Sequence, residues 1–366
     1  ACAAILFIIY KSGINRHDTG HIIGALCPML VISLLMTIHH FRRLPRVRFI
    51  KPLIASLLLA SILCGSYILS ARPHAMVIVA LHPSRIKTCV KYLLIGDASL
   101  ENQWRDHQTY AMQELPTCDP RLTTDVYPYR LDKLIHLGAP VRLRPTLQSY
   151  AAMSGPLARA NRDHLLGDKA PQQILFIKDI VLDGQYPALS DSLSWPILLT
   201  HYDVVDIQSS YLVLHRNASP RASRFEPIAA VRLKMDETAD IPAIPDGAKG
   251  IWAKVHYKTA AWGKLRGLLY KRPVAIANLT NADGDKLAFR LTPRLAEEGF
   301  LISPYSVMHP SWYRLATRPA AEKPPASLTL SKIQLTTWPR ETGPQSYEDE
   351  ILVEFFAFYF DAQPRP

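Results

Sequence analysis

Two long apolar stretches dominate the N-terminal part of the chain. Residues 22–38 and 52–70 contain no Asp, Glu, Lys or Arg. At a rise of about 1.5 Å per residue, a helix of either length matches the hydrocarbon core of a bilayer. Both stretches are apolar on every side, whereas a core helix of a soluble protein usually has one polar face. The pattern therefore predicts two transmembrane helices.

The segment between these stretches predicts how they are oriented. Residues 39–51 carry five Lys or Arg residues and no acid, and loops of this kind stay on the cytoplasmic side. Residues 11–21 then lie on the outer face, and the chain after residue 71 is exported. The sequence begins without Met inside another apolar run, residues 1–10. We expect this run to be the tail of a further span in a longer protein, which makes 1–71 the transmembrane region.

Short apolar runs alternate with helical patterns over residues 84–220. Within this segment the patterns predict strands at 91–95, 124–127, 141–147, 174–180 and 211–215, and helices at 98–115, 131–137, 156–166 and 192–201. A further strand is expected at 76–81. Alternation of this kind is typical of an α/β domain with a largely parallel sheet.

The helical patterns fade over residues 225–366. Strand patterns separated by turn residues predict strands at 229–233, 250–259, 271–279, 286–292, 299–302, 327–336 and 351–360. This rhythm is typical of an all-β sandwich, with 351–360 as a central strand. The expected fold class is therefore a membrane α-helical hairpin followed by an exported α/β domain and a C-terminal all-β sandwich.

The net charge of +11 reflects mainly the membrane topology. Seven Lys or Arg residues and one acid lie in residues 1–71, which leaves a small basic excess for the rest of the chain. We therefore predict no nucleic-acid partner, although the remaining excess suits anionic lipid headgroups or acidic glycans.

Two of the five cysteines lie in the predicted exported part. Cys89 and Cys118 would meet an oxidising compartment there, so we consider a disulfide between them, with two buried free thiols as the alternative. The spacing of Cys and His residues does not resemble a zinc site. The sequence therefore predicts neither a metal nor a cofactor.

The predicted outer loop concentrates reactive side chains beside a membrane span. It contains Arg16, His17, Asp18 and His21 within residues 11–21. An Arg can bind a phosphate through two parallel hydrogen bonds, and an Asp or a His can act as a general base. We assign Asp18 and His17 as catalytic candidates and Arg16 and His21 as substrate-binding candidates. The alternative is a polar loop that merely sits at the headgroup level.

A second candidate patch lies where a strand is expected to end and a helix to begin. Arg144, Gln148 and Tyr150 bring a guanidinium, an amide and a phenol to this position. Ligands of open α/β sheets are commonly bound there, so these side chains are candidates for contacts with a sugar or a phosphate. The alternative is a turn whose polar groups bond to one another.

The same two patches carry a resemblance. The loop pattern Lys11-x-Gly-x-x-Arg16-His-Asp-x-Gly-His21 resembles a loop of uncharacterised multi-spanning bacterial membrane proteins of glycosyltransferase-like type. The segment Arg144-Pro-x-x-Gln148-Ser-Tyr150 is similar to the segment after their last span, although Ile14-Asn15 stands where Phe-Val is expected. The resemblance implies a bacterial inner-membrane location with the domains after residue 71 on the periplasmic or extracellular side.

These observations lead to one expected function and two alternatives. The expected function is envelope glycan assembly by transfer of a sugar from a lipid-linked donor to a glycan acceptor, with the lipid bilayer as a partner. The first alternative is a membrane-anchored module that binds glycan or a protein without catalysis. Transport, the second, is less favoured because the predicted spans contain almost no polar side chains. Trp252, Tyr257 and Trp262 are either a platform for sugar stacking or part of the sandwich core.

Overall fold

The computed structural model describes residues 102 and 105 and, with gaps, the chain from residue 116 onward. The described residues are 102, 105, 116–131, 134, 137–177, 184–208, 211–269, 272–305, 309–319, 322–338 and 346–362. The predicted spans, the outer loop and the strands expected at 76–81 and 91–95 lie outside them. Of the helix expected at 98–115, residues 102 and 105 are described, and both are helical. The described helices are all too short or too polar to cross a bilayer.

The segment predicted as an α/β domain contains a four-stranded sheet. Its strands are β1 (Thr124–Tyr127), β2 (Gln173–Ile177), β3 (Tyr202–Ile207) and β4 (Tyr211–Arg216), in the order β1-β2-β4-β3. Only β1 and β2 pair in parallel, whereas β4 pairs antiparallel with both β2 and β3. The expected largely parallel sheet is therefore wrong for the described strands. The connection from β3 to β4 is too short for a crossover, so it produces a hairpin.

Two helices of this segment confirm the sequence patterns. The helix α7 (Gly155–Leu166) begins with Pro156 in its first turn and ends before Gly167, and α8 (Ser194–His201) packs against it. Short 3-10 turns occur at Ser149–Ala151 and Pro187–Leu189.

The strand predicted at 141–147 is wrong. Only Val141 makes a bridge, to Thr124 of β1. Pro145 has no N–H to donate to a ladder, and the N–H of Thr146 donates instead to Oδ1 of Asn161 at 2.8 Å. A side-chain amide thus replaces a neighbouring strand as the partner of this main chain.

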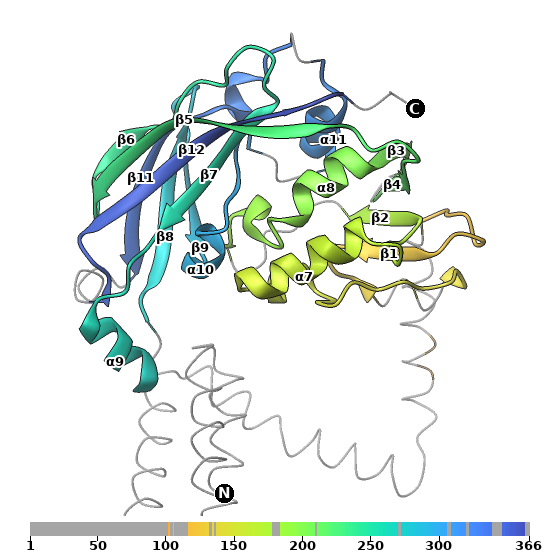
Figure 1. Cartoon of the computed structure of the whole chain (residues 1–366), viewed down its shortest axis with the longest axis horizontal. Coiled ribbons are helices and arrows are strands. Elements are labelled where there is room, and N and C mark those ends of the chain that lie inside the picture. The colour runs from red at the N-terminus through yellow and green to blue at the C-terminus, as the bar shows by residue number, and fades with distance from the viewer. Residues whose placement is uncertain are drawn as a thin grey trace, which may run out of the picture. The chain divides into compact units, whose positions relative to one another are not determined.

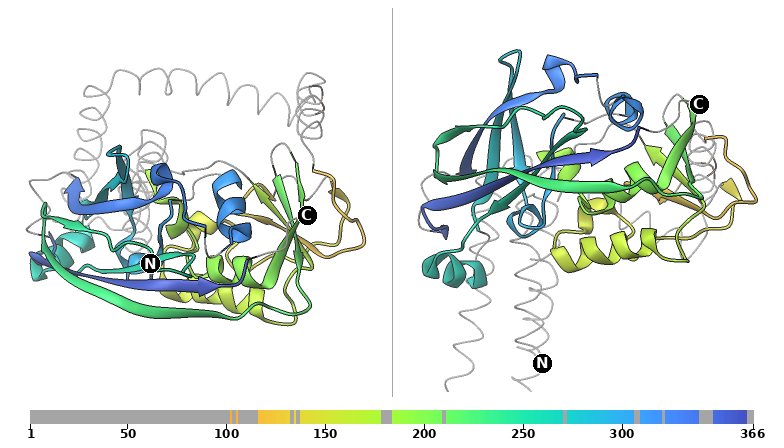
Figure 2. Two further views of the ribbon diagram at one scale, coloured as in Figure 1. Left: turned by 90° about the horizontal axis from the view of Figure 1, so that it is seen from above. Right: turned by 45° about the horizontal axis from the view of Figure 1, so that its top comes forward.

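Residues 223–360 contain two four-stranded sheets that form a β-sandwich (Figure 1). One sheet has the order β10-β7-β12-β5 and the other β6-β11-β8-β9, and all their described pairs are antiparallel. The strands are β5 (Ser223–Lys234), β6 (Thr238–Asp240), β7 (Gly250–His256), β8 (Val274–Asn281), β9 (Lys286–Leu291), β10 (Phe300–Ser303), β11 (Leu330–Trp338) and β12 (Glu350–Phe360). The prediction that 351–360 is a central strand is confirmed, because β12 lies between β7 and β5. Figure 2 shows β5 and β12 side by side along their length.

The sandwich also contains helices that the strand patterns did not predict. They are α9 (Ala261–Leu269), α10 (Pro293–Ala296) and α11 (His309–Thr317), with a 3-10 turn at Ala326–Leu328. In Figure 1, α8, α10 and α11 lie between the sandwich and the first sheet. The helix α8 packs beside β3, α10 beside β7 and α11 beside β4.

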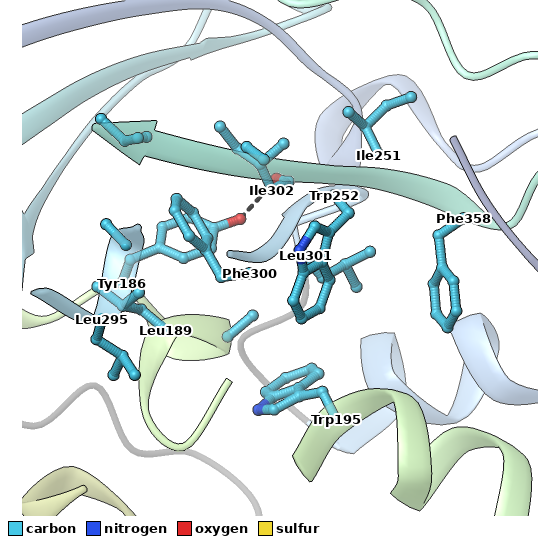
Figure 3. Close-up of a cluster of buried hydrophobic side chains, with 14 of the residues drawn as sticks. Tyr186, Leu189, Trp195, Ile251, Trp252, Leu295, Phe300, Leu301, Ile302 and Phe358 are labelled. Atoms are coloured by element: carbon cyan, nitrogen blue, oxygen red, sulfur yellow. Dashed lines mark hydrogen bonds between the residues drawn. The ribbon is translucent and has the colours of Figure 1, made fainter. Parts of the chain in front are cut away.

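One hydrophobic core joins the first sheet to the sandwich. It extends from Tyr127 of β1 to Phe360 of β12. Tyr186 lies in its centre, where its hydroxyl donates to the carbonyl of Ile302 at 2.6 Å and its ring meets Phe300 (Figure 3). The rings of Phe176 on β2 and Trp312 on α11 stack 4.7 Å apart. The described residues of 107–264 and 273–366 accordingly form one compact unit.

Candidate functional site

A cluster of buried polar side chains lies between β1, α7 and the start of α8. We call it the polar cluster; it contains Asp125 of β1, Arg144 of the following loop, Asn161 of α7 and Asp191 just before α8. Each side chain is at most 1% exposed. Buried charges are costly unless they are paired, so the contacts within this cluster decide what it can do.

Arg144 is bound mainly by main-chain carbonyl groups. Its Nη2 donates to the carbonyl oxygens of Val126, Pro128 and Leu147, the last two at 3.3 and 3.4 Å. Its Nε lies 3.6 Å from Oδ2 of Asp125, and its guanidinium stacks 4.6 Å over the ring of Tyr127. These contacts tie the loop to the end of β1. They orient the guanidinium inward, away from solvent.

Asn161 connects the two remaining parts of the cluster. Its Nδ2 donates to Oδ2 of Asp191 at 3.0 Å, while its Oδ1 accepts from the N–H of Thr146 at 2.8 Å. Asp191 has a backbone φ of 52°, a left-handed conformation in which Asp and Asn are the best tolerated residues after Gly. The helix α7 therefore positions the loop on one side and the start of α8 on the other.

Burial alters the acidity of both carboxyl groups. It raises the pKa of Asp191 to about 7, although the charge of Arg144 and the hydrogen bond from Asn161 act in the opposite direction. Burial also raises the pKa of Asp125, against the charge of Arg144 and a hydrogen bond from the N–H of Val126. At neutral pH the cluster thus contains a carboxyl group that is close to its titration point.

Several polar atoms of the cluster lack a hydrogen-bond partner among the described residues. They include Nε of Arg144 and Oδ1 of Asp191, and the adjacent Ser192 has an unpartnered Oγ as well. Unpartnered buried polar atoms are rare in folded proteins and often accompany a functional role. Comparable atoms also lie elsewhere in the described core, among them the hydroxyl oxygens of Thr336 and Thr337.

A basic cleft opens next to the polar cluster. Arg142, Leu143, His164 and Lys169 line this cleft of about 290 Å³, and no described carboxyl group lines it. His164 lies one turn after Asn161 on α7. Burial lowers the pKa of His164, and the charges of Arg144, Arg142 and Lys169 lower it further. Its imidazole is therefore neutral at pH 7, between two permanent cations.

The residues predicted from sequence are only partly brought together. The hydroxyl of Tyr150 donates to Oε1 of Gln148 at 2.5 Å at the protein surface, whereas Arg144 lies inside. Whether these three residues bind a substrate stays a prediction. The structure does show that Arg144 is already engaged by main-chain groups.

The other predicted residues are largely outside the described part of the chain. Arg16, His17, Asp18 and His21 all lie there, and so does Cys89. Cys118 is half-buried, and burial raises the pKa of its thiol. The disulfide therefore stays a prediction.

The aromatic platform on the sandwich is not formed. Trp252 and Tyr257 are 5% and 3% exposed, as expected for core residues, whereas Trp262 is 55% exposed. The core interpretation is confirmed for the first two residues only.

Sequence reasoning missed Asp191, Arg142, His164 and Lys169. Asp191 lies between two serines just before a helix, which resembles a helix-capping sequence and gives no sign of burial. Arg142 and Arg144 are two residues apart, a spacing that places both side chains on one face of an extended segment, whereas the structure buries Arg144 and leaves Arg142 at the cleft. His164 follows Asn161 by three residues on a predicted helix, so their common face was available from the sequence.

Comparisons with known proteins give no similar protein. A scan against protein-family models finds no match, and neither the curated proteins nor the solved structures include a significant one. The resemblance of the outer loop and of residues 144–150 to glycosyltransferase-like membrane proteins accordingly stays a prediction.

Proposed function

We propose that this protein acts in bacterial envelope glycan assembly at the outer face of the inner membrane. In this proposal the basic cleft binds the phosphate of a lipid-linked sugar. The observation that carries it is the convergence of Arg142, His164 and Lys169 around one cleft without a described carboxyl group.

The chemistry of the cleft suits a phosphate ester. Two permanent cations attract the anion, and the guanidinium of Arg142 still has donors besides the one bonded to the carbonyl of Asp168. The neutral imidazole of His164 adds a hydrogen-bond donor or acceptor without requiring another buried charge. Leu143, which is 36% exposed, offers an apolar contact to the rest of the ligand.

The polar cluster supports this cleft rather than entering it. Asn161 and His164 are three residues apart, so they lie on the same side of α7. Arg144 holds the loop that carries Arg142 and Leu143. Fixed positions for the cationic groups reduce the ordering that a bound ligand requires.

Transfer of the sugar is assigned to the outer loop. Arg16 and His21 would contact the substrate beside the bilayer, and Asp18 would orient or deprotonate the acceptor, assisted by His17. Gln148 and Tyr150 would contact the sugar. The reaction needs no cofactor in this proposal.

A non-enzymatic module that binds glycan or a protein is the second candidate. One observation favours it: the two carboxyl groups next to the cleft, Asp125 and Asp191, are at most 1% exposed. Neither reaches a ligand in the cleft as the structure stands. If the outer loop is not catalytic, the remaining function of the protein is to bind glycan or a protein without catalysis.

Binding is tested with the full chain in detergent and a short polyprenyl phosphate as the probe. Lys169→Gln and Arg142→Gln should each weaken binding by roughly tenfold or more, because a hydrogen bond to a charged group contributes about 1.5 to 3 kcal/mol. Lys332→Gln, an exposed position on β11, is the matched control. Unchanged affinity in both cleft variants would refute the cleft as a phosphate site.

Catalysis is tested separately in cells. Asp18→Asn and Arg16→Gln barely change side-chain size, so they remove charge with little effect on packing. Lost glycan product at normal protein levels would assign the reaction to the outer loop. Normal product with loss of binding in Lys169→Gln would favour the binding module instead.

A further inference from the structure

A second pocket lies in the sandwich and shares no lining residue with the basic cleft. We call it the sandwich pocket. Its volume is about 540 Å³, which is within the range of pockets that bind small molecules. It is lined by residues 243–248 before β7, by Arg318 and residues 322–324 after α11, and by Thr329 before β11. More than half of these residues are apolar or glycine.

Two buried cations adjoin this pocket. Arg318, which lines it, is 6% exposed, and Lys249, which follows the lining residue Ala248, is 0% exposed. Nη2 of Arg318 donates to the carbonyl of Lys249 at 2.8 Å, while Nζ of Lys249 donates to the carbonyl of Arg318. Nη1 of Arg318 donates to the carbonyl of Glu322. These bonds hold the segment after α11 against the start of β7.

The positive charges of this pair are not balanced by ion pairs within the described part of the chain. Neither side chain pairs with a described carboxyl group. Burial, together with the charge of Arg318, lowers the pKa of Lys249 to about 8 against the opposing charge of Asp361. Nε of Arg318 is buried and has no described hydrogen-bond partner. Neutral donors would satisfy the main-chain carbonyls without the cost of burying charge, so the two cations indicate a further role.

The other charged residues of the pocket limit the charge of its ligand. Asp246, Glu322 and Lys323 all line it and are exposed, so water and salt screen them. The two carboxylates disfavour a ligand with several negative charges, such as a diphosphate, whereas the buried cations favour an anion. A single negative charge satisfies both conditions. The apolar walls at Ile244 and Pro245 suit a hydrocarbon chain.

We propose that the sandwich pocket binds a small monocarboxylate whose hydrocarbon part contacts Ile244, Pro245 and Pro324. The carboxylate accepts a hydrogen bond from Nε of Arg318 and supplies the counter-charge that the described residues do not provide. Because the guanidinium is already held by two main-chain carbonyls, little further ordering is required when the ligand binds. The inference goes beyond the proposed function, since neither the basic cleft nor the outer loop takes part.

Titration calorimetry of the full chain in detergent tests the site with hexanoate as the probe, after subtraction of a titration into protein-free micelles. Hexanamide has the same length and no charge, so it should bind at least about tenfold more weakly than hexanoate. Arg318→Gln should weaken hexanoate binding by at least about tenfold and hexanamide binding much less.

A second variant decides the question even if Arg318→Gln does not fold. Ala243 is an exposed lining residue, so Ala243→Trp fills the pocket from its open side and should weaken hexanoate binding at least about tenfold. Ala230→Trp is the matched control, because Ala230 is exposed on β5 and does not line the pocket. It should leave the affinity for hexanoate unchanged.

Three results would overturn the proposal. Absence of hexanoate binding, or binding that Ala243→Trp does not weaken, would mean that the pocket is not the site. Equal affinities for hexanoate and hexanamide would show that the buried cations do not select an anion. Hexyl phosphate that binds at least about tenfold more tightly than hexanoate, and loses this advantage in Ala243→Trp, would replace the carboxylate by a phosphate ester.

Discussion

The substitution Asp191→Asn tests whether the polar cluster contains a carboxyl group that titrates near neutral pH. Asn has almost the same shape as Asp, accepts the hydrogen bond from Asn161 through its own Oδ1, and tolerates the φ of 52° found at this position. The variant therefore removes the titrating charge while it keeps the geometry.

The expected effect follows from the difference between the pKa of Asp191 in the folded state and its pKa in the unfolded state. Burial raises the pKa of Asp191 from 3.8 to about 7 in the folded protein. Between these values the folded state keeps a proton that the unfolded state has lost, so the free energy of unfolding falls as the pH rises. A shift of roughly three pKa units corresponds to about 4 kcal/mol. This stability is present below about pH 4 and lost by about pH 7 to 8.

Thermal unfolding of the full chain, followed by Trp fluorescence between pH 4 and pH 8, measures the effect. The wild type and Asp191→Asn should melt at similar temperatures at pH 4. At pH 8 the variant should melt roughly 10 °C higher, since 1 kcal/mol corresponds to about 2 to 4 °C for a domain of this size. Asp283→Asn, an exposed position in the turn after β8, is the control. A melting difference that does not change with pH would refute the reasoning.

Three further predictions concern packing and covalent structure. Trp312 is 1% exposed, so Trp312→Ala should lower the free energy of unfolding in chemical denaturation by about 3 to 5 kcal/mol. Trp338 is 66% exposed, and Trp338→Ala should change this free energy by less than about 0.5 kcal/mol. Gly263→Val should cost about 1 to 3 kcal/mol in the same assay, because its side chain would meet neighbouring main chain; an unchanged midpoint would show that α9 is not held there. Mass spectrometry of the unreduced protein should show Cys89 linked to Cys118, and alkylation of both thiols would exclude the disulfide.

The sandwich could be predicted because its strands have clear boundaries. Turn residues separate its apolar runs, and β12 combines length with a high aromatic content, which placed it correctly in the interior of its sheet. The strand β3 was missed because Tyr202 follows the last residue of α8 directly. No Gly or Pro marks the change from helix to strand.

Other features depend on distant contacts that a local pattern does not contain. The helix α11 has buried Trp312, Leu315 and Ala316, a helical spacing that was available in the sequence but occurs within a region of strands. The strand predicted at 141–147 does not form, because the N–H of Thr146 donates to the side chain of Asn161 and not to a neighbouring strand. The polar cluster assembles residues from four separate segments of the chain, so its burial follows from tertiary packing alone.

The position of β12 has a consequence for biosynthesis. This strand forms last in chain order, yet it lies between β5 and β7 and pairs with both. Arg232 of β5 and Glu350 of β12, which contact each other, are 118 residues apart in the chain. Until β12 has left the ribosome, β5 and β7 have no common partner, and their apolar side chains remain available to chaperones and proteases. A premature stop codon anywhere before residue 350 would therefore remove β12, the strand that joins β5 to β7, and the truncated product should be degraded.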